Sequence, residues 1–553
     1  MPVVELSYAR LQKLVGKATK KQISDSLPFL GLDIESEDKD LVRIEYSPNR
    51  PDYSTDFGIA LGLQGLLGIK TGAIKLKIKK SNKYQILVKS DISKIRPFVT
   101  GIIAKNGNID NQTLEQIIQM QEDLHMGIGR KRTKSSIGIH DLDRISFPLI
   151  YTTTNRNTKF IPLKSIKENT ISEILEQTDV GRSYGYILGN FSKVPIILDS
   201  NNNIISLPPI INAAVTTVTT KTKNLFVEVT GINKSDIEDV LSVVATILES
   251  AGFTLESVKI SGAKNSSPKL DQKNISVSTS LINQILGLNL NTPKIISSLK
   301  KSRLDALSKG NEIICTIPAY RFDIFGPLDL VEEVALGYGI RNLEPILTPS
   351  QTIGQINPVS LQLKSLNQIM IGLGYLEALN SSLTSKRVLY DMTNRNSTKI
   401  ISVLDSKSQE HTILRDSILP GLLENLSRNI HESYPQKLFE TGNVFTIDDP
   451  ISEKISFSSI SAHKDANFTE IKSILQSALK TGFGITIETK TLSHPTFEAG
   501  HCASVISNGK SIGVIGKIDS KIVENYKIRM PVVGFEISLS ESILYNKISS
   551  NQK

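Results

Sequence analysis

The chain of 553 residues contains no tryptophan and only two cysteines, and 6% of its residues are aromatic. Cys315 stands in an apolar run far from Cys502, so we expect neither a disulfide framework nor a thiolate metal site. No apolar run reaches the ~18–20 residues that span a bilayer, and the first residues lack the basic start and apolar core of a signal peptide. We therefore expect a soluble cytoplasmic protein that does not bind membranes.

Acidic residues are in the minority, with 55 Asp and Glu against 64 Lys and Arg and a net charge of +9. This excess favours a polyanionic partner such as nucleic acid, although lysine is frequent along the whole chain. The segment "IKTGAIKLKIKKSNKYQILVK" (69–89) is the most lysine-rich and marks a domain boundary. Its alternation over 74–78 is typical of a strand. Lysines that block pairing at a sheet edge are favoured there over a nucleic-acid contact.

The length predicts three to five domains of ~100–200 residues, and polar stretches at 261–273 and 347–358 read as linkers. A weak repeat joins two regions that are 271 positions apart. Each copy is predicted to contain two short helices, a strand (41–46 or 313–317), an arginine turn and an apolar helix, with Thr292 as one N-cap. The matching residues are Ser7, Leu11, Leu14, Gly16, Arg50 and Asp52, followed by Ser278, Ile282, Ile285, Gly287, Arg321 and Asp323.

The second copy contains four closely spaced acids in "AYRFDIFGPLDLVEEV" (319–334), which are Asp323, Asp329, Glu332 and Glu333. The first copy has no glutamates at the matching offsets, so the fold alone does not require the last two. Four carboxylates this close repel one another, and Mg²⁺ with carboxylate and water ligands would relieve the repulsion. The alternative is that the acids only complement the dipole of a helix N-terminus.

The region between the two copies contains two candidate sites. The cations of "GRKRTK" (129–134) could bind phosphates, or form a solvated loop, and His140 beside Asp141 is weak evidence for acid–base catalysis. The second site is a polar pocket beside a double proline, which fixes an extended backbone. The RNA-binding candidates are Arg130, Lys131, Arg132 and Lys134, and the pocket candidates are Ser206, Asn212, Glu228 and Thr230.

Several long motifs resemble the phenylalanyl-tRNA synthetase beta subunit in its archaeal and eukaryotic form. The resemblance is carried, in family order, by "SPNRPDYSTDFGIALGLQGLLG" (47–68), "KRTKSSIGIHDLD" (131–143), "ISLPPIINAAVTTVTTKTKNLFVEVTG" (205–231), "IPAYRFDIFGPLDLVEEVALGYG" (317–339), "LRDSILPGLLENLSRN" (414–429) and "KLFETGNVF" (437–445). The end of the chain at Lys553, without the extra anticodon-binding domain of bacterial beta subunits, also favours the archaeal type.

The resemblance implies a Mg²⁺ site at a subunit interface, held by Asp323, Asp329, Glu332 and Glu333. It also implies that the central domain hydrolyses tyrosine wrongly attached to tRNA(Phe), and the family often has Asp where Glu228 stands. An apolar site rejects a substrate with one added hydroxyl by only ~100-fold, so a second sieve is useful. No Ser-His-Asp or Cys-His array is evident, and we expect a positioned water to attack, with the terminal ribose hydroxyl assisting.

Residues 359–553 resemble a class II synthetase fold without its catalytic arginines. The motif at 438–442, "LFETG", lacks the arginine expected between Phe and Glu, and 533–539 has neither a glycine-rich run nor an arginine. Because such sites clamp phosphates with arginines, we expect this domain to be non-catalytic. Arg415 is interpreted as structural or interfacial, and His494 and His501 as structural histidines.

The sequence thus predicts an α+β multidomain protein. Two small helix-strand-helix modules (1–88 and 270–346) bracket an α/β editing domain (89–262), and a class II synthetase-like antiparallel-sheet domain follows (358–553). The expected function is that of the beta subunit of phenylalanine–tRNA ligase, in a complex of two alpha and two beta chains that binds tRNA(Phe), with ATP and phenylalanine bound through alpha. The alternatives are a free-standing RNA-binding hydrolase of mischarged tRNA and a pure scaffold.

Overall fold

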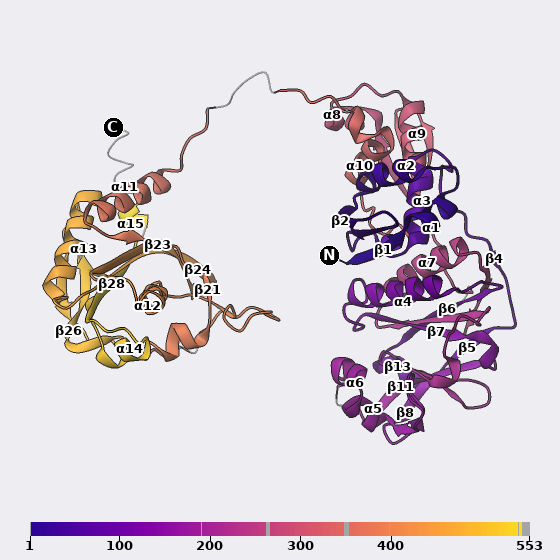
Figure 1. Cartoon of the computed structure of the whole chain (residues 1–553), viewed down its shortest axis with the longest axis horizontal. Coiled ribbons are helices and arrows are strands. Elements are labelled where there is room, and N and C mark those ends of the chain that lie inside the picture. The colour runs from indigo at the N-terminus through magenta and orange to yellow at the C-terminus, as the bar shows by residue number, and fades with distance from the viewer. Residues whose placement is uncertain are drawn as a thin grey trace. The chain divides into compact units, whose positions relative to one another are not determined.

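The computed structural model describes residues 2–189, 191–261, 266–347, 353–397, 399–448, 450–539 and 541–544. Parts of both predicted linkers (262–265 and 348–352) and the chain end from 545 lie outside these ranges. The chain divides into two compact units, Met1–Leu347 and Thr348–Lys553, and each is described by itself (Figure 1). Within the described residues, no helix is both long and apolar enough to cross a membrane.

The two copies of the repeat have the same strand-helix-helix-strand-strand-helix order. Each forms a three-stranded antiparallel sheet, β1-β3-β2 in the first module and β17-β19-β18 in the second. Their elements are β1 (Val3–Ser7), α1 (Tyr8–Val15), α2 (Lys20–Ser26), β2 (Asp33–Glu37), β3 (Leu41–Glu45) and α3 (Asp56–Leu66), then β17 (Lys273–Ser278), α8 (Thr279–Leu286), α9 (Thr292–Lys301), β18 (Asp305–Lys309), β19 (Glu312–Ile317) and α10 (Pro327–Tyr338).

The repeat is confirmed, with more strands than the sequence predicted. Leu11 and Ile282, which match in the repeat, are both fully buried in their modules. The sequence predicted one strand per module because the others are short and β2, β17 and β18 are polar, and all five residues of β2 are exposed. The predicted N-cap Thr292 is wrong. Asn291 caps α9, since its side-chain oxygen accepts a hydrogen bond from the backbone N–H of Lys294 at 3.1 Å.

The central domain contains two packed sheets with helices on the outside. The sheets have the orders β13-β12-β11-β8-β5-β16 and β4-β15-β6-β14-β7. Its strands and main helices are β4 (Ile78–Lys79), β5 (Gln85–Val88), β6 (Phe98–Lys105), α4 (Asn111–Met126), β7 (Ser135–Asp141), β8 (Leu149–Asn155), β9 (Lys159–Phe160), β10 (Asn169–Thr170), α5 (Ile171–Gln177), α6 (Asp179–Tyr184), β11 (Lys193–Leu198), β12 (Ile204–Leu207), β13 (Ile211–Asn212), β14 (Leu225–Gly231), α7 (Lys234–Ser250), β15 (Thr254–Ser257) and β16 (Lys259–Ile260).

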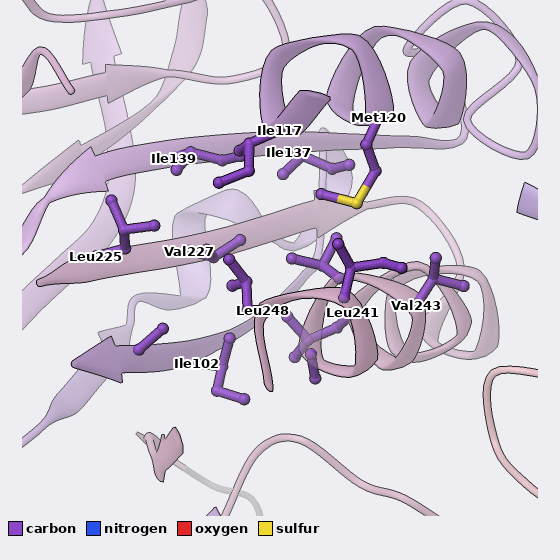
Figure 2. Close-up of a cluster of buried hydrophobic side chains, with 14 of the residues drawn as sticks. Ile102, Ile117, Met120, Ile137, Ile139, Leu225, Val227, Leu241, Val243 and Leu248 are labelled. Atoms are coloured by element: carbon purple, nitrogen blue, oxygen red, sulfur yellow. The ribbon is translucent and has the colours of Figure 1, made fainter. Parts of the chain in front are cut away.

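Side chains alternate across the buried strand β14, which lies between β6 and β7. Leu225 and Val227 face α4 and α7 in one core, where Met120 and Leu241 lie (Figure 2). Phe226, between them in sequence, belongs to a second core against the other sheet. Glu228 and Thr230 lie on the same side of the strand as Phe226, so the fold carries their polar groups between the two sheets.

The C-terminal unit is built on a seven-stranded sheet of order β20-β23-β24-β28-β27-β26-β25, antiparallel except for the pair β20 and β23. Its main elements are α11 (Pro358–Gly372), β20 (Leu376–Glu377), β21 (Leu383–Thr384), β22 (Ile413–Leu414), α12 (Leu419–Arg428), β23 (Gln436–Ile447), β24 (Ile451–Ala462), α13 (Phe468–Phe483), β25 (Glu488–Thr491), β26 (Phe497–Ser507), β27 (Lys510–Ile518), α14 (Ser520–Asn525), β28 (Val532–Ser538) and α15 (Glu541–Leu544). The antiparallel sheet predicted for this domain is present.

Candidate functional site

The central domain encloses a cavity of about 710 Å³ beside α4 and β7. Its wall combines residues from both sheets, since Ser206 comes from β12 and Glu228 from β14. The turn that holds Pro208 and Pro209 forms another side. A cavity of this size accommodates an amino-acid side chain together with part of a nucleotide.

Glu228 is a buried carboxylate at this cavity, with 2% of its surface exposed. It stands opposite Gly101 on β6 and Gly138 on β7. A Cβ at Gly138 would lie 2.5 Å from Glu228 Oε1, so glycine leaves the space that the carboxylate occupies. The Ser206 hydroxyl donates a hydrogen bond to Oε1 at 3.1 Å, while Oε2 has no hydrogen-bond partner. A buried acceptor without a partner costs about 1–3 kcal/mol, and a ligand that donates a hydrogen bond would recover it.

His140 lies next to this carboxylate and is fully buried. Its Nε2 is 4.0 Å from Glu228 Oε1 and has no hydrogen-bond partner, whereas its Nδ1 is 2.8 Å from the Thr216 hydroxyl oxygen. Its ring stacks on Phe226, with 5.8 Å between the ring centroids. Asp141 is engaged elsewhere, because its carboxylate accepts a hydrogen bond from Thr222. The carboxylate that His140 faces is therefore Glu228, not its sequence neighbour Asp141.

Three of the four predicted pocket residues come together. Ser206, Asn212 and Glu228 line the cavity, and the Asn212 amide lies 3.3 Å from the Ser206 hydroxyl. Thr230 is not among the lining residues. It is fully buried, and its hydroxyl accepts a hydrogen bond from Arg96 Nε at 2.9 Å, so it supports the strand behind the cavity.

The predicted basic cluster divides between the surface and the cavity wall. Arg130 and Lys131 are exposed and remain candidates for phosphate contacts. Arg132 is buried in the wall, where it donates hydrogen bonds to the Ile210 carbonyl and the Glu122 carboxylate, each at 2.9 Å. This corrects the prediction of four solvent-facing cations, which failed because the left-handed backbone at 130–132, with φ of 47°, 53° and 66°, turns one of three successive side chains inward.

Glu122 on α4 anchors that arginine. Burial alone would raise the pKa of Glu122. The hydrogen bond with His125 and the charges of His125 and Arg132 outweigh this effect and lower the pKa to about 2. The carboxylate is therefore ionised at neutral pH and holds Arg132 against the turn that ends at Ile210.

Sequence reasoning missed Gly138 and underrated His140. Both signals were present in "SIGIHD" (136–141), since residues two apart on a strand share one face. What the sequence did not reveal is that this face meets Glu228, because the pairing of β7 with β14 joins segments about 90 residues apart.

The four acids of the second module do not converge on one point. Arg321, which is 2% exposed, donates hydrogen bonds to Asp323 at 2.8–3.2 Å and forms a close ion pair with Glu333. Asp329 accepts the backbone N–H groups of Phe325 and Gly326 and so caps α10, and Glu332 is exposed.

This arrangement does not fit the predicted Mg²⁺. Among the described residues, no group of three or more His, Cys, Asp or Glu side chains is placed to hold a metal ion. The buried guanidinium of Arg321 already supplies the positive charge between Asp323 and Glu333. The metal site thus stays a prediction from the sequence.

The first module repeats half of this arrangement. Arg50 donates to Asp52 at 2.7 and 2.9 Å, as Arg321 does to Asp323. Burial and the nearby charge of Arg321 would lower the pKa of Arg50, but the Asp52 carboxylate raises it above its usual value. The two arginine turns therefore lie close together, and Glu333 adds a negative charge beside the buried Arg321.

The C-terminal unit has a polar pocket of about 460 Å³ whose floor is closed by an ion pair. Arg415, 5% exposed, lies 2.6 Å from the fully buried Glu440, whose other oxygen accepts a hydrogen bond from the Asn380 amide. Glu440 belongs to the motif that lacks the expected arginine. Glu536, from the other deficient motif, accepts the Ile418 and Leu419 backbone N–H groups at the start of α12. These carboxylates are used inside the domain, in line with the structural reading of Arg415.

His494 and His501 do not form a common site. His494 Nδ1 accepts a hydrogen bond from the Thr496 backbone N–H at 3.2 Å, and burial, followed by the charge of Arg395, lowers its pKa. His501 is more than half exposed and lies 3.7 Å from Glu498. Cys315 and Cys502 are buried free thiols whose pKa values burial raises.

Three family models match the chain in order. The B3/4 domain matches residues 81–251, the tRNA synthetase B5 domain matches 275–340, and the phenylalanyl tRNA synthetase beta chain CLM domain matches 345–539. The crystal structure of an N-terminal fragment of the phenylalanyl-tRNA synthetase beta subunit from Pyrococcus horikoshii superimposes with a TM-score of 0.58 at 31% identity, covering 61% of this chain and 99% of that fragment.

Two curated relatives align over nearly the whole length. The phenylalanine–tRNA ligase beta subunit of Archaeoglobus fulgidus is 36% identical over 546 residues, covering 98% of both chains. That of Methanocaldococcus jannaschii is 35% identical over 554 residues, covering 98% of this chain and 100% of the relative. The chain therefore belongs to the family of phenylalanine–tRNA ligase beta subunits and is part of that ligase, an aminoacyl-tRNA synthetase.

Proposed function

We propose that the central cavity hydrolyses tyrosine wrongly attached to tRNA(Phe). The observation that carries the proposal is the buried Glu228 carboxylate, whose Oε2 has no partner at a cavity of about 710 Å³. A tyrosine side chain brings one phenolic O–H donor, which phenylalanine lacks. A hydrogen bond to a charged acceptor contributes about 1.5–3 kcal/mol, so this contact alone discriminates roughly 10- to 100-fold.

The expected chemistry is ester hydrolysis by water. The water oxygen attacks the carbonyl carbon of the aminoacyl ester, the bond from that carbon to the ribose oxygen breaks, and a proton passes to the departing ribose hydroxyl. The cavity wall has hydroxyl and amide groups, on Ser206, Asn212 and Thr216, that can orient the substrate. The lining contains no cysteine or histidine, which supports a positioned water instead of a covalent intermediate.

The test is deacylation of Tyr-tRNA(Phe) and Phe-tRNA(Phe) by the full chain. Glu228→Ala should lower the rate with Tyr-tRNA by roughly 10- to 100-fold and change the rate with Phe-tRNA little, because only tyrosine donates to the carboxylate. Glu332→Gln, at an exposed residue of another domain, is the matched control. Equal hydrolysis of Tyr-tRNA by wild type and Glu228→Ala would place the editing site elsewhere.

We further propose that this chain works in the cytoplasm with an alpha chain that holds the ATP and phenylalanine sites, as two alpha and two beta chains. The support is an apolar edge on the C-terminal unit, where β20 ends the sheet and pairs only with β23. Ile371, Leu376 and Leu379 there are 55%, 70% and 93% exposed. Leu376 and Leu379 are three positions apart in the chain, and exposed apolar side chains that cluster are typical of protein interfaces.

Purified beta chain should form no phenylalanyl-adenylate and should charge tRNA(Phe) only after assembly with alpha. Leu376→Asp combined with Leu379→Asp should weaken that assembly, measured by analytical ultracentrifugation, while Tyr-tRNA hydrolysis by the beta chain persists. Pyrophosphate exchange by the pure beta chain, or unchanged assembly of the double variant, would contradict this part of the proposal.

A further inference from the structure

Six lysines lie on the segment that leads from the first module into the central domain. Residues 70–83 contain no acidic residue. The six lysines are exposed, and none forms an ion pair with a described carboxylate. They are Lys70, Lys75, Lys77, Lys79, Lys80 and Lys83.

The fold places a second basic group against this segment. The backbone N–H of Gly72 donates to the Lys300 carbonyl at 2.7 Å, and Arg303 Nη1 donates to the Lys70 carbonyl at 2.7 Å. Lys300 and Lys301 form the last turn of α9, and neither pairs with a described carboxylate. We call these two lysines together with the six of residues 70–83 the lysine surface. Sequence alone could not reveal it, because its two parts are more than 200 residues apart.

Edge protection explains only a small part of this surface. β4 is indeed the last strand of its sheet, but it is two residues long and contains only Lys79. Lysines 70, 75, 77, 80, 83, 300 and 301 lie outside the strand, where there is no pairing to block. The nearest carboxylates are engaged, since Glu249 accepts the Lys77 backbone N–H at 2.8 Å and Asp305 accepts that of Ala73 at 3.0 Å. A third acid, Glu256 on β15, is the register partner of Lys79 and forms an ion pair with Lys105. The eight lysines thus outnumber the acids beside them.

The lysine surface is also well placed relative to the cavity. β4 and β7 are the two edges of the same five-stranded sheet, and β7 borders the cavity. Four inter-strand steps of ~4.8 Å separate the edges by roughly 19 Å. Each strand of a duplex carries one phosphate per ~3.4 Å of helix axis, so this span corresponds to about six nucleotides along the axis. An RNA end in the cavity and its backbone at the lysine surface are compatible.

We propose that the lysine surface binds the phosphate backbone of the tRNA whose aminoacylated end enters the central cavity; the identity of that RNA rests on the function proposed above. Such contacts position the RNA without reading its sequence. They also release counterions, so binding weakens as salt rises. Each phosphate contact adds about 0.7–0.9 to the magnitude of the slope of log K against log salt.

The experiment is to measure tRNA binding by the full chain across a salt series for Lys75→Glu, Lys77→Glu and Lys79→Glu combined. We expect about tenfold weaker binding or more, and a salt slope smaller by about 2–3, for tRNA(Phe) and an unrelated tRNA alike. The matched control combines Lys13→Glu, Lys17→Glu and Lys21→Glu, three exposed lysines of the first module, and should bind as wild type does.

Deacylation kinetics separate this inference from the proposed editing function. The triple variant should raise KM for Tyr-tRNA and leave kcat unchanged. Weaker binding and a smaller salt slope would support the lysine surface even if wild type hydrolysed no Tyr-tRNA. A triple Lys→Gln variant at 75, 77 and 79 guards against misfolding. If this variant proves folded by thermal denaturation and binds tRNA with the salt slope of the wild type, the inference is overturned. If the variant aggregates while its monomer binds tRNA normally, the lysines serve edge protection instead.

Discussion

The central cavity and the C-terminal pocket handle buried charge in opposite ways. At the central cavity, Glu228 Oε2 has no partner, and neither has Nε2 of His140, which lies beside Glu228 outside the lining. In the C-terminal pocket, Arg415 and Asn380 between them satisfy both oxygens of Glu440. Leaving a buried acceptor unpaired is costly, so a fold tolerates it where a ligand completes the pairing. The comparison indicates that the central cavity is suited to bind a ligand, whereas the buried charges of the C-terminal pocket stabilise the fold.

The largest effect on stability should come from breaking the ion pair between Arg415 and Glu440. Arg415→Met leaves the Glu440 carboxylate buried without a countercharge, which should lower the free energy of unfolding by about 3–5 kcal/mol. Urea denaturation followed by circular dichroism measures this loss. Adding Glu440→Leu should recover much of it, since an apolar pair replaces the ion pair. A loss of unfolding free energy below ~1 kcal/mol would mean that Arg415 and Glu440 do not form a buried ion pair.

The second module offers a similar test on a smaller scale. Glu333→Gln weakens one of the two carboxylate contacts of Arg321 and should cost about 2 kcal/mol of unfolding free energy, because Asp323 still neutralises part of the charge. Glu332→Gln, at the neighbouring exposed residue, is the control and should cost little.

The same module makes a metal test possible. Because Arg321 supplies the countercharge, EDTA or added Mg²⁺ should leave the melting temperature of the beta chain unchanged. A rise in Tm with Mg²⁺ that Glu333→Gln abolishes would instead support the magnesium site predicted from the sequence.

At the open cavity, His140→Phe should have a moderate effect. Phenylalanine can keep the stacking on Phe226 but cannot face Glu228 with a ring nitrogen. We expect the ratio of kcat/KM for Tyr-tRNA to that for Phe-tRNA to fall by up to about tenfold, because a polar ring nitrogen no longer lies beside the carboxylate. An unchanged ratio would show that His140 acts only in packing.

The smallest effect concerns pH and the cavity wall. The folded pKa of Glu122 is lowered to about 2, below the value of ~4.3 in an unfolded chain. Its contribution to stability is therefore present above about pH 4.3 and is lost as the pH falls toward 2. Glu122→Gln should lower the urea midpoint at pH 6 and should differ less from wild type near pH 3. The side chain is 41% exposed, so we expect less than ~1 kcal/mol.

The sequence predicted the modules well because the repeat preserved their turns and buried positions, such as Leu11 with Ile282. It predicted the cavity only in part. Ser206, Asn212 and Glu228 were recognised from their polarity within apolar strands, but Thr230 has the same pattern and points to Arg96. The difference depends on which neighbour each residue meets across the sheet, and one sequence carries no record of that register.

Arg132 and Arg321 illustrate the same limit for charge. Both stand in segments whose charges suggested ligands, phosphate in one case and metal in the other, and both arginines are buried against carboxylates of their own chain. Counting charges along a sequence predicts where charge is concentrated. It does not predict whether the partner is a ligand or another residue, because that depends on which side chains the backbone turns inward.

The central claim is that the free oxygen of Glu228 recognises the phenolic hydroxyl of tyrosine. The most direct measurement is a crystal structure of the full chain with a non-hydrolysable tyrosyl-adenosine analogue, compared with the phenylalanyl analogue. We predict the phenolic oxygen within the ~2.5–3.0 Å range of an O–H···O hydrogen bond from Glu228, with weaker binding of the phenylalanyl analogue. An analogue bound outside the central cavity, or a phenolic oxygen that contacts other groups while both analogues bind equally, would contradict it.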